Sequence, residues 1–205
     1  MNDSLPSAIT VRALSYRFGK RAVLNALDLD VVQGAFYALL GANGAGKTTL
    51  LQLIAGVRPM QHGSTRVLGA SVSQLTTKQR QQTTYVAEGQ ALPTWMRLEQ
   101  LEAFCAPLYP TWDMSLASKL RTRFDLDPRA RIGAMSRGQR MKAALLCALA
   151  PRPKLIVMDE PFTGMDVAVK DELVRGLLDA ASLEGATVLL SSHDIAEIEI
   201  GRAHV

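Results

Sequence analysis

The sequence has no run of about twenty consecutive apolar residues, which is the length that a helix needs to cross a bilayer. Residues 1–6 also lack the basic stretch followed by an apolar stretch that marks a secretory signal. We therefore expect a soluble, intracellular protein. Its 205 residues, 48% of them apolar, are enough to bury a sizeable core in one or two domains.

Cysteine, histidine and aromatic residues are scarce, and each scarcity excludes a class of site. The two cysteines, Cys105 and Cys147, lie in apolar, helix-like surroundings and predict buried thiols rather than a disulfide or a metal site. His62 and His204 have no chemical context and are expected on the surface. The net charge is +4, but the basic residues gather between residues 119 and 142 without an aromatic platform. We therefore expect no nucleic-acid partner.

Residues 41–49 read G-A-N-G-A-G-K-T-T and fill every fixed position of a phosphate-binding loop. The glycines let successive N–H groups point at one centre, Lys47 adds a charge on the outer phosphates, and Thr48 offers a hydroxyl to Mg²⁺. A strand-like apolar run precedes the loop and helical spacing follows it, so a helix N-terminus faces the phosphates. The predicted ligands are ATP and Mg²⁺, held by Gly41, Asn43, Gly44, Ala45, Gly46, Lys47, Thr48 and Thr49.

A second motif, residues 155–161, is an apolar run that ends in two carboxylates and predicts a buried parallel strand. We expect Asp159 to hold Mg²⁺ through water. Glu160 is the predicted general base, because a base must reach the water in line with the γ-phosphate.

The segment Met135-Ser136-Arg137-Gly138-Gln139-Arg140 opens a predicted helix and resembles the L-S-G-G-Q signature of ATP-binding cassette (ABC) ATPases. Ser136 is a predicted N-cap, and the helix start offers an anion site. A cap explains Ser136 but leaves Gly138 and Gln139 at this spacing unexplained, so all three are predicted to contact nucleotide.

Two further segments follow in the order of that family. Residues 162–166 resemble its D-loop, and residues 189–194 resemble the strand that leads to its switch histidine. The resemblance implies that His193 contacts the γ-phosphate and holds Glu160 and water in register. The predicted catalytic residues are therefore Lys47, Glu160 and His193.

Near the N-terminus, residues 14–20 resemble the family's aromatic loop, in which a ring stacks on adenine. Phe18 fits best, with Tyr16 in reserve, while packing of either ring under neighbouring strands is the other interpretation.

The chain departs from the family at two positions. Glu88 stands where the family has a Mg²⁺-contacting glutamine, and an acid there is predicted to bind the metal or orient water. Arg137 replaces the first signature glycine, and it either bonds a partner's γ-phosphate or points to solvent.

The expected fold is α/β, a P-loop NTPase core with an antiparallel β portion and a small helical subdomain. Short alternating runs over residues 8–40 predict the antiparallel strands, and residues 98–108 and 115–124 have helical spacing. We expect one domain over 1–205, with the core at 1–91 and 135–205 and the subdomain at 92–134. After a predicted helix at 194–198 the chain ends earlier than the family does, either because it is cut or because it is short.

The resemblance implies a function as well. Two copies would dimerise head to tail, with ATP between residues 41–48 of one and 136–139 of the other, and would drive a separate transmembrane permease from the cytoplasmic face of the membrane. The S-R-G-Q-R spelling resembles bacterial cassettes that serve exporters. A soluble non-transport ABC ATPase and a regulatory cassette with weak hydrolysis stay open.

The segment 88–96 joins the sheet to the helical part and contains Trp95. As an exposed anchor Trp95 would dock the membrane subunit, and as a core residue it would close the subdomain.

Overall fold

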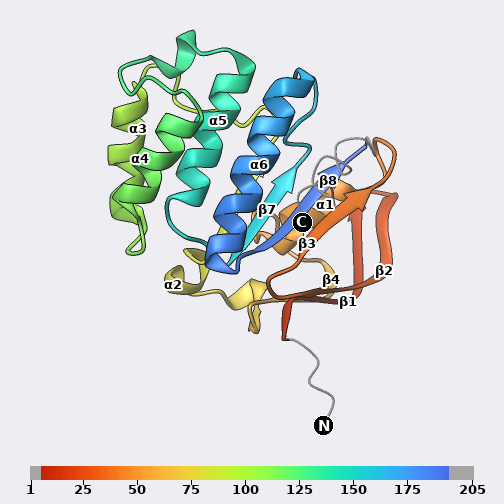
Figure 1. Cartoon of the computed structure of the whole chain (residues 1–205). Coiled ribbons are helices and arrows are strands. Elements are labelled where there is room, and N and C mark those ends of the chain that lie inside the picture. Colours follow the sequence, from red (N-terminus) through yellow and green to blue (C-terminus); the bar gives the residue numbers. More distant parts are fainter. Residues whose placement is uncertain (1–5, 194–205) are drawn as a thin grey trace.

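A computed structural model describes residues 6–193, apart from the side chains of residues 180–184. Two sheets lie at one end of the molecule, and a group of helices lies at the other (Figure 1). Within the described residues, no helix has the length and apolar character that a membrane span requires.

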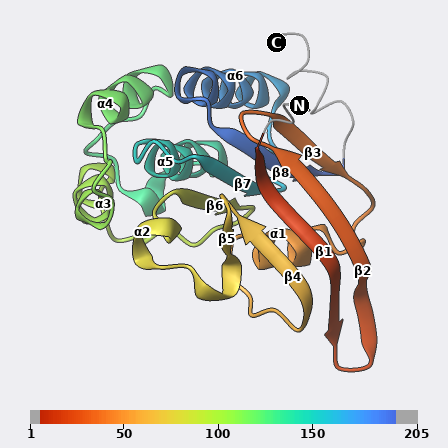
Figure 2. The same ribbon diagram turned by 90° about the horizontal axis from the view of Figure 1, so that it is seen from below.

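The first sheet is antiparallel, in the order β2-β1-β4-β5. Its strands are β1 (Ser7–Phe18), β2 (Arg21–Val32), β4 (His62–Val67) and β5 (Ala70–Ser71). β1 lies between its two long partners and pairs Val11 with Leu29 on one side and with Thr65 on the other. Figure 2 shows this sheet wrapped beside α1.

The predicted bounds of the antiparallel portion, 8–40, are wrong. β3 (Phe36–Leu40) pairs in parallel with β8 (Thr187–Ser192), from Phe36 opposite Val188 to Leu40 opposite Ser192. The two missing antiparallel strands come from residues 62–71, where the sequence is polar and contains Gly63. β4 pairs with β1, from Ile9 opposite Val67 to Ser15 opposite His62, and β5 pairs with β4. Because the β1–β4 pairing joins residues remote in the sequence, local alternation cannot reveal it.

The second sheet is parallel, in the order β3-β8-β7-β6, with β6 (Thr83–Ala87) at one edge and β7 (Leu155–Asp159) inside. All five residues of β7 are buried. Leu155 and Val157 pack with α1 (Lys47–Ile54) and the antiparallel sheet, whereas Ile156 and Met158 pack toward the helices. The predicted buried parallel strand is therefore confirmed, with helices or sheet on both faces.

The helical side contains α5 (Arg137–Leu149), which packs beside α6 (Val167–Glu184), and the smaller α3 (Leu98–Cys105) and α4 (Met114–Arg123). These two match the predicted helical runs, and η2 (Ala106–Leu108) extends the first. Short helical turns complete the described elements at α2 (Thr77–Arg80), η1 (Val72–Gln74) and η3 (Ile132–Ala134). The α/β class is confirmed, and the division into core and subdomain stays a prediction.

Several single-residue predictions have outcomes here. His62 is exposed, as expected. Cys105 and Cys147 are free, but both are only partly buried, so the prediction of buried thiols is wrong in degree. Trp95 is 70% exposed, which excludes the core interpretation. The predicted helix at 194–198 and His204 lie outside the described residues.

Candidate nucleotide site

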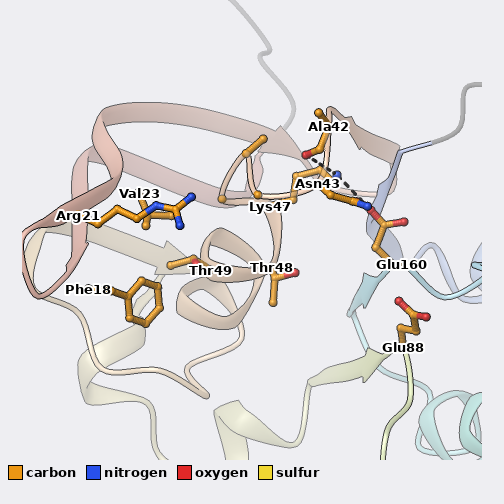
Figure 3. A pocket seen from close by; sticks show the side chains of 13 residues that line it. Phe18, Arg21, Val23, Ala42, Asn43, Lys47, Thr48, Thr49, Glu88 and Glu160 are labelled. Carbon is orange, nitrogen blue, oxygen red and sulfur yellow. Dashed lines mark hydrogen bonds and ion pairs between the residues drawn. The ribbon is translucent and has the colours of Figure 1, made fainter.

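The loop between β3 and α1 forms the floor of a pocket of about 530 Å³, a size within the usual range of small-ligand sites. Gly46 adopts φ +94°, and a Cβ there would meet Val23 and Leu24 at 3.1 Å, so glycine is required for both reasons. Asn43, Gly44, Ala45 and Gly46 line the pocket together with Lys47, Thr48 and Thr49 (Figure 3). Gly41 does not line it.

Lys47 is held at the inner end of this pocket. Its ammonium donates to the carbonyls of Gly41 and Ala42, the latter at 3.3 Å, and pairs with Glu160 Oε1 at 3.1 Å. Both side chains of the ion pair are nearly buried, with 10% and 12% exposed. The ammonium of Lys47 therefore lies beside the loop, where its hydrogen bonds and its ion pair are ones that the oxygens of a polyphosphate could replace.

Asp159 lies at the carboxyl end of β7 and is buried. Among the described residues its carboxylate contacts only hydroxyl groups: Thr48 at 3.1 Å, Ser191 at 2.8 Å and Tyr85 at 3.5 Å. Burial and the nearby Asp159 charge raise the pKa of Tyr85 to about 12, so its hydroxyl stays protonated. A buried carboxylate beside a threonine hydroxyl is an oxygen-ligand set that suits Mg²⁺.

Glu160 is the centre of the site. Its Oε2 contacts His193 Nδ1 at 2.7 Å and Thr163 Oγ1 at 3.1 Å. Its backbone adopts φ +48°, unusual for a residue with a side chain, and its amide donates to Ser191 Oγ at 3.0 Å. The structure thus brings Lys47, Glu160 and His193, which the sequence places far apart, into one connected group.

Burial alone would raise the pKa of Glu160, because it disfavours the charged form. The hydrogen bonds with His193 and Lys47 and the positive charge of Lys47 outweigh that effect, and the pKa lies below its usual range. Glu160 is therefore a carboxylate near neutral pH, and His193 donates to it through Nδ1.

At the opposite side of the loop, Phe18 lines the pocket and is 47% exposed (Figure 3). Tyr16 is 6% exposed and packs edge-on against Phe18 at 5.1 Å, and the Arg58 guanidinium lies 4.9 Å from the Phe18 ring. Phe18, and not Tyr16, is thus the ring that faces the pocket.

The signature turn lies away from this pocket: Ser136, Gly138 and Gln139 do not line it. Ser136 caps α5 as predicted, and its Oγ accepts from the Gln139 amide at 3.2 Å while Gln139 Oε1 accepts from the Ser136 amide at 2.9 Å. A Cβ on Gly138 would approach Val169 to 3.2 Å. Capping and packing therefore account for all three residues, contrary to our expectation, and their nucleotide contact stays a prediction.

Glu88 lines the pocket but does not reach the Asp159 carboxylate in this structure. Its Oε1 pairs with the guanidinium of Arg137 at 2.5 Å, so the two residues that depart from the family pattern contact each other. The role of Glu88 as a metal ligand stays a prediction.

Sequence analysis missed several residues of the site. Ser191 connects Asp159 to the Glu160 backbone, and its polar side chain inside an apolar strand was the signal that could have revealed it. Thr163 bonds Glu160 from the predicted D-loop. Arg21 and Val23 line the pocket from β2, and no spacing in the sequence points to them.

Comparisons with known proteins agree with this geometry. Residues 24–163 match a family model described as "ABC transporter". The chain is 31% identical over 194 residues to the "Fe(3+) ions import ATP-binding protein FbpC" of Streptomyces avermitilis, and the match covers 92% of this chain and 56% of that protein. It is also 31% identical to the "Taurine import ATP-binding protein TauB" of Escherichia coli O157:H7, with 88% and 71% covered.

A solved structure described as "Structure of ATP binding subunit of ABC transporter" superimposes with a TM-score of 0.83 at 27% identity. The match covers 94% of this chain and 82% of that one. The chain spans little more than half the length of the iron-import relative (56%).

Proposed function

This chain belongs to the ABC transporter family, and from that membership we propose that it binds and hydrolyses ATP to drive a transporter. The observation that carries the proposal is the pocket lined by residues 42–49 and Glu160, with the Lys47–Glu160 ion pair inside it and the Asp159 carboxylate against the lining residue Thr48. Each part has a role in phosphoryl transfer, where catalysis is mostly positioning and charge stabilisation.

ATP would enter with its base against Phe18 and its phosphates over the loop. The backbone amides of residues 43–48 and the N-terminus of α1 would then face the negative charge of the phosphates. Lys47 would exchange Glu160 Oε1 for phosphate oxygens, because a polyphosphate offers more negative charge than one carboxylate. Binding of the substrate thus frees the Glu160 oxygen that the reaction needs.

Glu160 would then accept a proton from the attacking water. Its Oε2 would stay hydrogen-bonded to His193 and Thr163. These two bonds would hold the carboxylate in one orientation while Oε1, released by Lys47, accepts the proton. The hydrogen bond that the Glu160 amide donates to Ser191 Oγ holds the strained backbone at this residue. His193 donates to Glu160, which fits its predicted role of holding Glu160 in register, and its contact with the γ-phosphate stays a prediction.

Thr48 and Asp159 would hold Mg²⁺, because their oxygens lie 3.1 Å apart beside the phosphate loop. When bound, the ion neutralises charge on the phosphates. Ser191 and Tyr85 keep the Asp159 carboxylate oriented without adding a competing cation.

The Ser136–Gln139 turn does not line the pocket of its own chain, so a contact with ATP would need a second copy of the chain. We propose a head-to-tail homodimer in which this turn faces the partner's ATP, with Ser136, Gly138 and Gln139 at the interface. Closed two-fold dimers are the commonest oligomers, and such an arrangement completes two equal sites.

The remaining partner would be a separate transmembrane permease, and binding to it would place the protein on the inner face of the cell membrane. Relatives named for Fe(3+) ions and taurine support a bacterial transport role. Both are importers by name, and the exporter direction inferred from the S-R-G-Q-R spelling stays a prediction.

ATP binding to the Lys47→Ala variant tests the site. A charge-assisted bond contributes about 1.5–3 kcal/mol, so the dissociation constant should rise at least tenfold, about 1.4 kcal/mol, by calorimetry. Lys20→Ala, which removes a lysine that does not line the pocket, is the control and should leave it unchanged. Equal affinities of wild type and Lys47→Ala would contradict the assignment of the loop.

A further inference from the structure

The two positions at which this chain departs from the family pattern are joined by a contact. Glu88 follows β6 and Arg137 begins α5, 49 residues later, and their charged groups meet at 2.5 Å. The sequence predicts separate roles for the two residues: Glu88 binds the metal or orients water, and Arg137 contacts a partner's γ-phosphate or points to solvent. Their pairing indicates that they act together.

Glu88 lies between two hollows of the surface. It lines the nucleotide pocket, and it also lines a second pocket of about 210 Å³ with Arg137, Arg140 and Pro161. Its amide donates to the Asp159 carbonyl at 2.8 Å. The backbone of Glu88 is therefore fixed to the strand that carries the site, and its side chain reaches the signature helix.

Arg137 is confined on its other side. A Cβ at Gly164 would lie 2.7 Å from the Arg137 guanidinium, so the segment after Glu160 packs directly against it. The other arginine of this pocket, Arg140, donates to the Met135 carbonyl at 2.6 Å. Arg137 is thus the arginine of this pocket that forms the ion pair with Glu88, and its guanidinium lies between Glu88 and Gly164.

We propose that Glu88 and Arg137 are a pair of positioning residues that fix the Ser136–Gln139 turn to the carboxyl end of β7. The inference rests on the proposed function, because the turn matters only if it faces a partner's ATP. In this account Glu88 acts through Arg137 and is not a metal ligand, and Arg137 acts within its own chain.

The pair is exposed, 42% for Glu88 and 47% for Arg137, so it adds little to the stability of the chain. An exposed pair is worth at most about fivefold in an equilibrium constant. A head-to-tail dimer contains the pair twice, so its loss should change the dimer constant by up to about 25-fold, the square of that factor. High salt should reduce the effect, because exposed charges are screened.

A double-mutant cycle tests the proposal. Glu88→Gln and Arg137→Gln are made singly and together in the Glu160→Gln background, and the ATP-dependent dimer constant is measured by analytical ultracentrifugation. Each single variant should weaken the dimer about 2- to 25-fold, and the double variant should be no weaker than either. The exchanged pair Glu88→Arg/Arg137→Glu should recover most of the loss.

The control is the Arg123–Asp179 ion pair, which joins α4 and α6 at 2.5 Å and is similarly exposed. Neither of its residues lines the two pockets above. Arg123→Gln and Asp179→Asn should leave the dimer constant unchanged. Additive effects of the Glu88 and Arg137 substitutions, or an equal effect of the control pair, would overturn the proposal.

A second arm needs neither ATP nor a dimer. In the wild-type monomer the amides of Gln139 and Arg140 bond to Ser136. Their hydrogen exchange should accelerate equally in Glu88→Gln and Arg137→Gln and return in the exchanged pair. If the wild type fails to bind ATP, the proposed function is wrong, while unchanged exchange in the single variants rejects the positioning pair itself.

The metal-ligand role predicts different signs. If Glu88 bound Mg²⁺, Glu88→Gln would raise the Mg²⁺ concentration needed for ATP-dependent dimerisation, whereas Arg137→Gln would lower it by releasing the carboxylate. The positioning pair predicts that both substitutions act in the same direction at every Mg²⁺ concentration. Opposite directions would replace our proposal with the metal-ligand role.

Discussion

Glu160 contacts three side chains that stabilise its charged form, and this sets how the nucleotide-free protein responds to pH. Its pKa is lowered in the folded state, mainly by His193 and Lys47 acting against burial. A carboxyl group with a lowered pKa stabilises the fold above its ordinary pKa, and that contribution is lost as the pH falls through the folded value.

We therefore predict that the stability advantage of wild type over Glu160→Gln shrinks as the pH falls below 4.5, the ordinary value for glutamate. Urea unfolding of both proteins between pH 7 and pH 3.5, without nucleotide or metal, measures the difference. A difference in free energy of unfolding that stays constant over this range would contradict the described contacts of Glu160.

Some residues of the site follow from the sequence because motif spacing fixes them. Lys47, Asp159 and Glu160 stand at ends of regular elements, and the order of elements places those ends at one edge of a parallel sheet. Arg21 and the Glu88–Arg137 pair could not be predicted in this way, because their contacts depend on how distant loops fold over that edge. Ser136 and Gln139 show the reverse case, since the capping box already explains both residues within the chain and their contact with nucleotide stays a prediction.

At the scale of elements, α6 is placed by a glycine in its interior. A Cβ on Gly176 would lie 2.7 Å from the ring of Phe124, which is fully buried at the end of α4. Alanine normally stabilises a helix interior by about 0.5–1 kcal/mol over glycine. Overpacking a rigid core costs about 1–3 kcal/mol, so the clash should prevail.

Gly176→Ala should accordingly destabilise the protein by about 1–2 kcal/mol in urea unfolding. The Phe124→Leu background provides the control, because a smaller side chain makes room for the added methyl group. There Gly176→Ala should be neutral or stabilising, and a similar loss in both backgrounds would show that the close packing of α4 on α6 is wrong.

Elements with strong local patterns were predicted well, and elements defined by pairing were not. The apolar run of β7 and the capped start of α5 are set by local residues. β4 and β5 are not, because His62, Gly63 and Ser64 are exposed and polar, and only Thr65 and Val67 bury their side chains against β1. The core that receives them is formed by segments remote in the sequence.

At the scale of the whole molecule, the helical side exposes large apolar residues that the isolated chain does not use. Trp95 is 70% exposed, whereas its neighbours Leu92 and Met96 pack against the core. A tryptophan held by a packed loop suits an interface anchor.

We predict that Trp95→Ala leaves the melting temperature and basal ATP turnover unchanged and weakens binding to the proposed membrane subunit by about 2 kcal/mol, roughly 30-fold. Val57→Ala, at a 62% exposed residue after α1, is the control and should bind as wild type. Copurification from membranes would provide the complex, and the affinity of each variant for the membrane subunit is then compared with that of wild type. Unchanged binding of Trp95→Ala would exclude this residue from the interface.

The central claim, that this pocket hydrolyses ATP with Glu160 as the general base, is tested most directly by ATP turnover of Glu160→Gln beside wild type. The substitution keeps the shape of the side chain and every other residue of the pocket but removes the proton acceptor, so the variant should bind ATP with at least wild-type affinity. Its turnover should fall by about 100-fold or more, because a general base contributes at least that much. Turnover within about threefold of wild type would contradict the account.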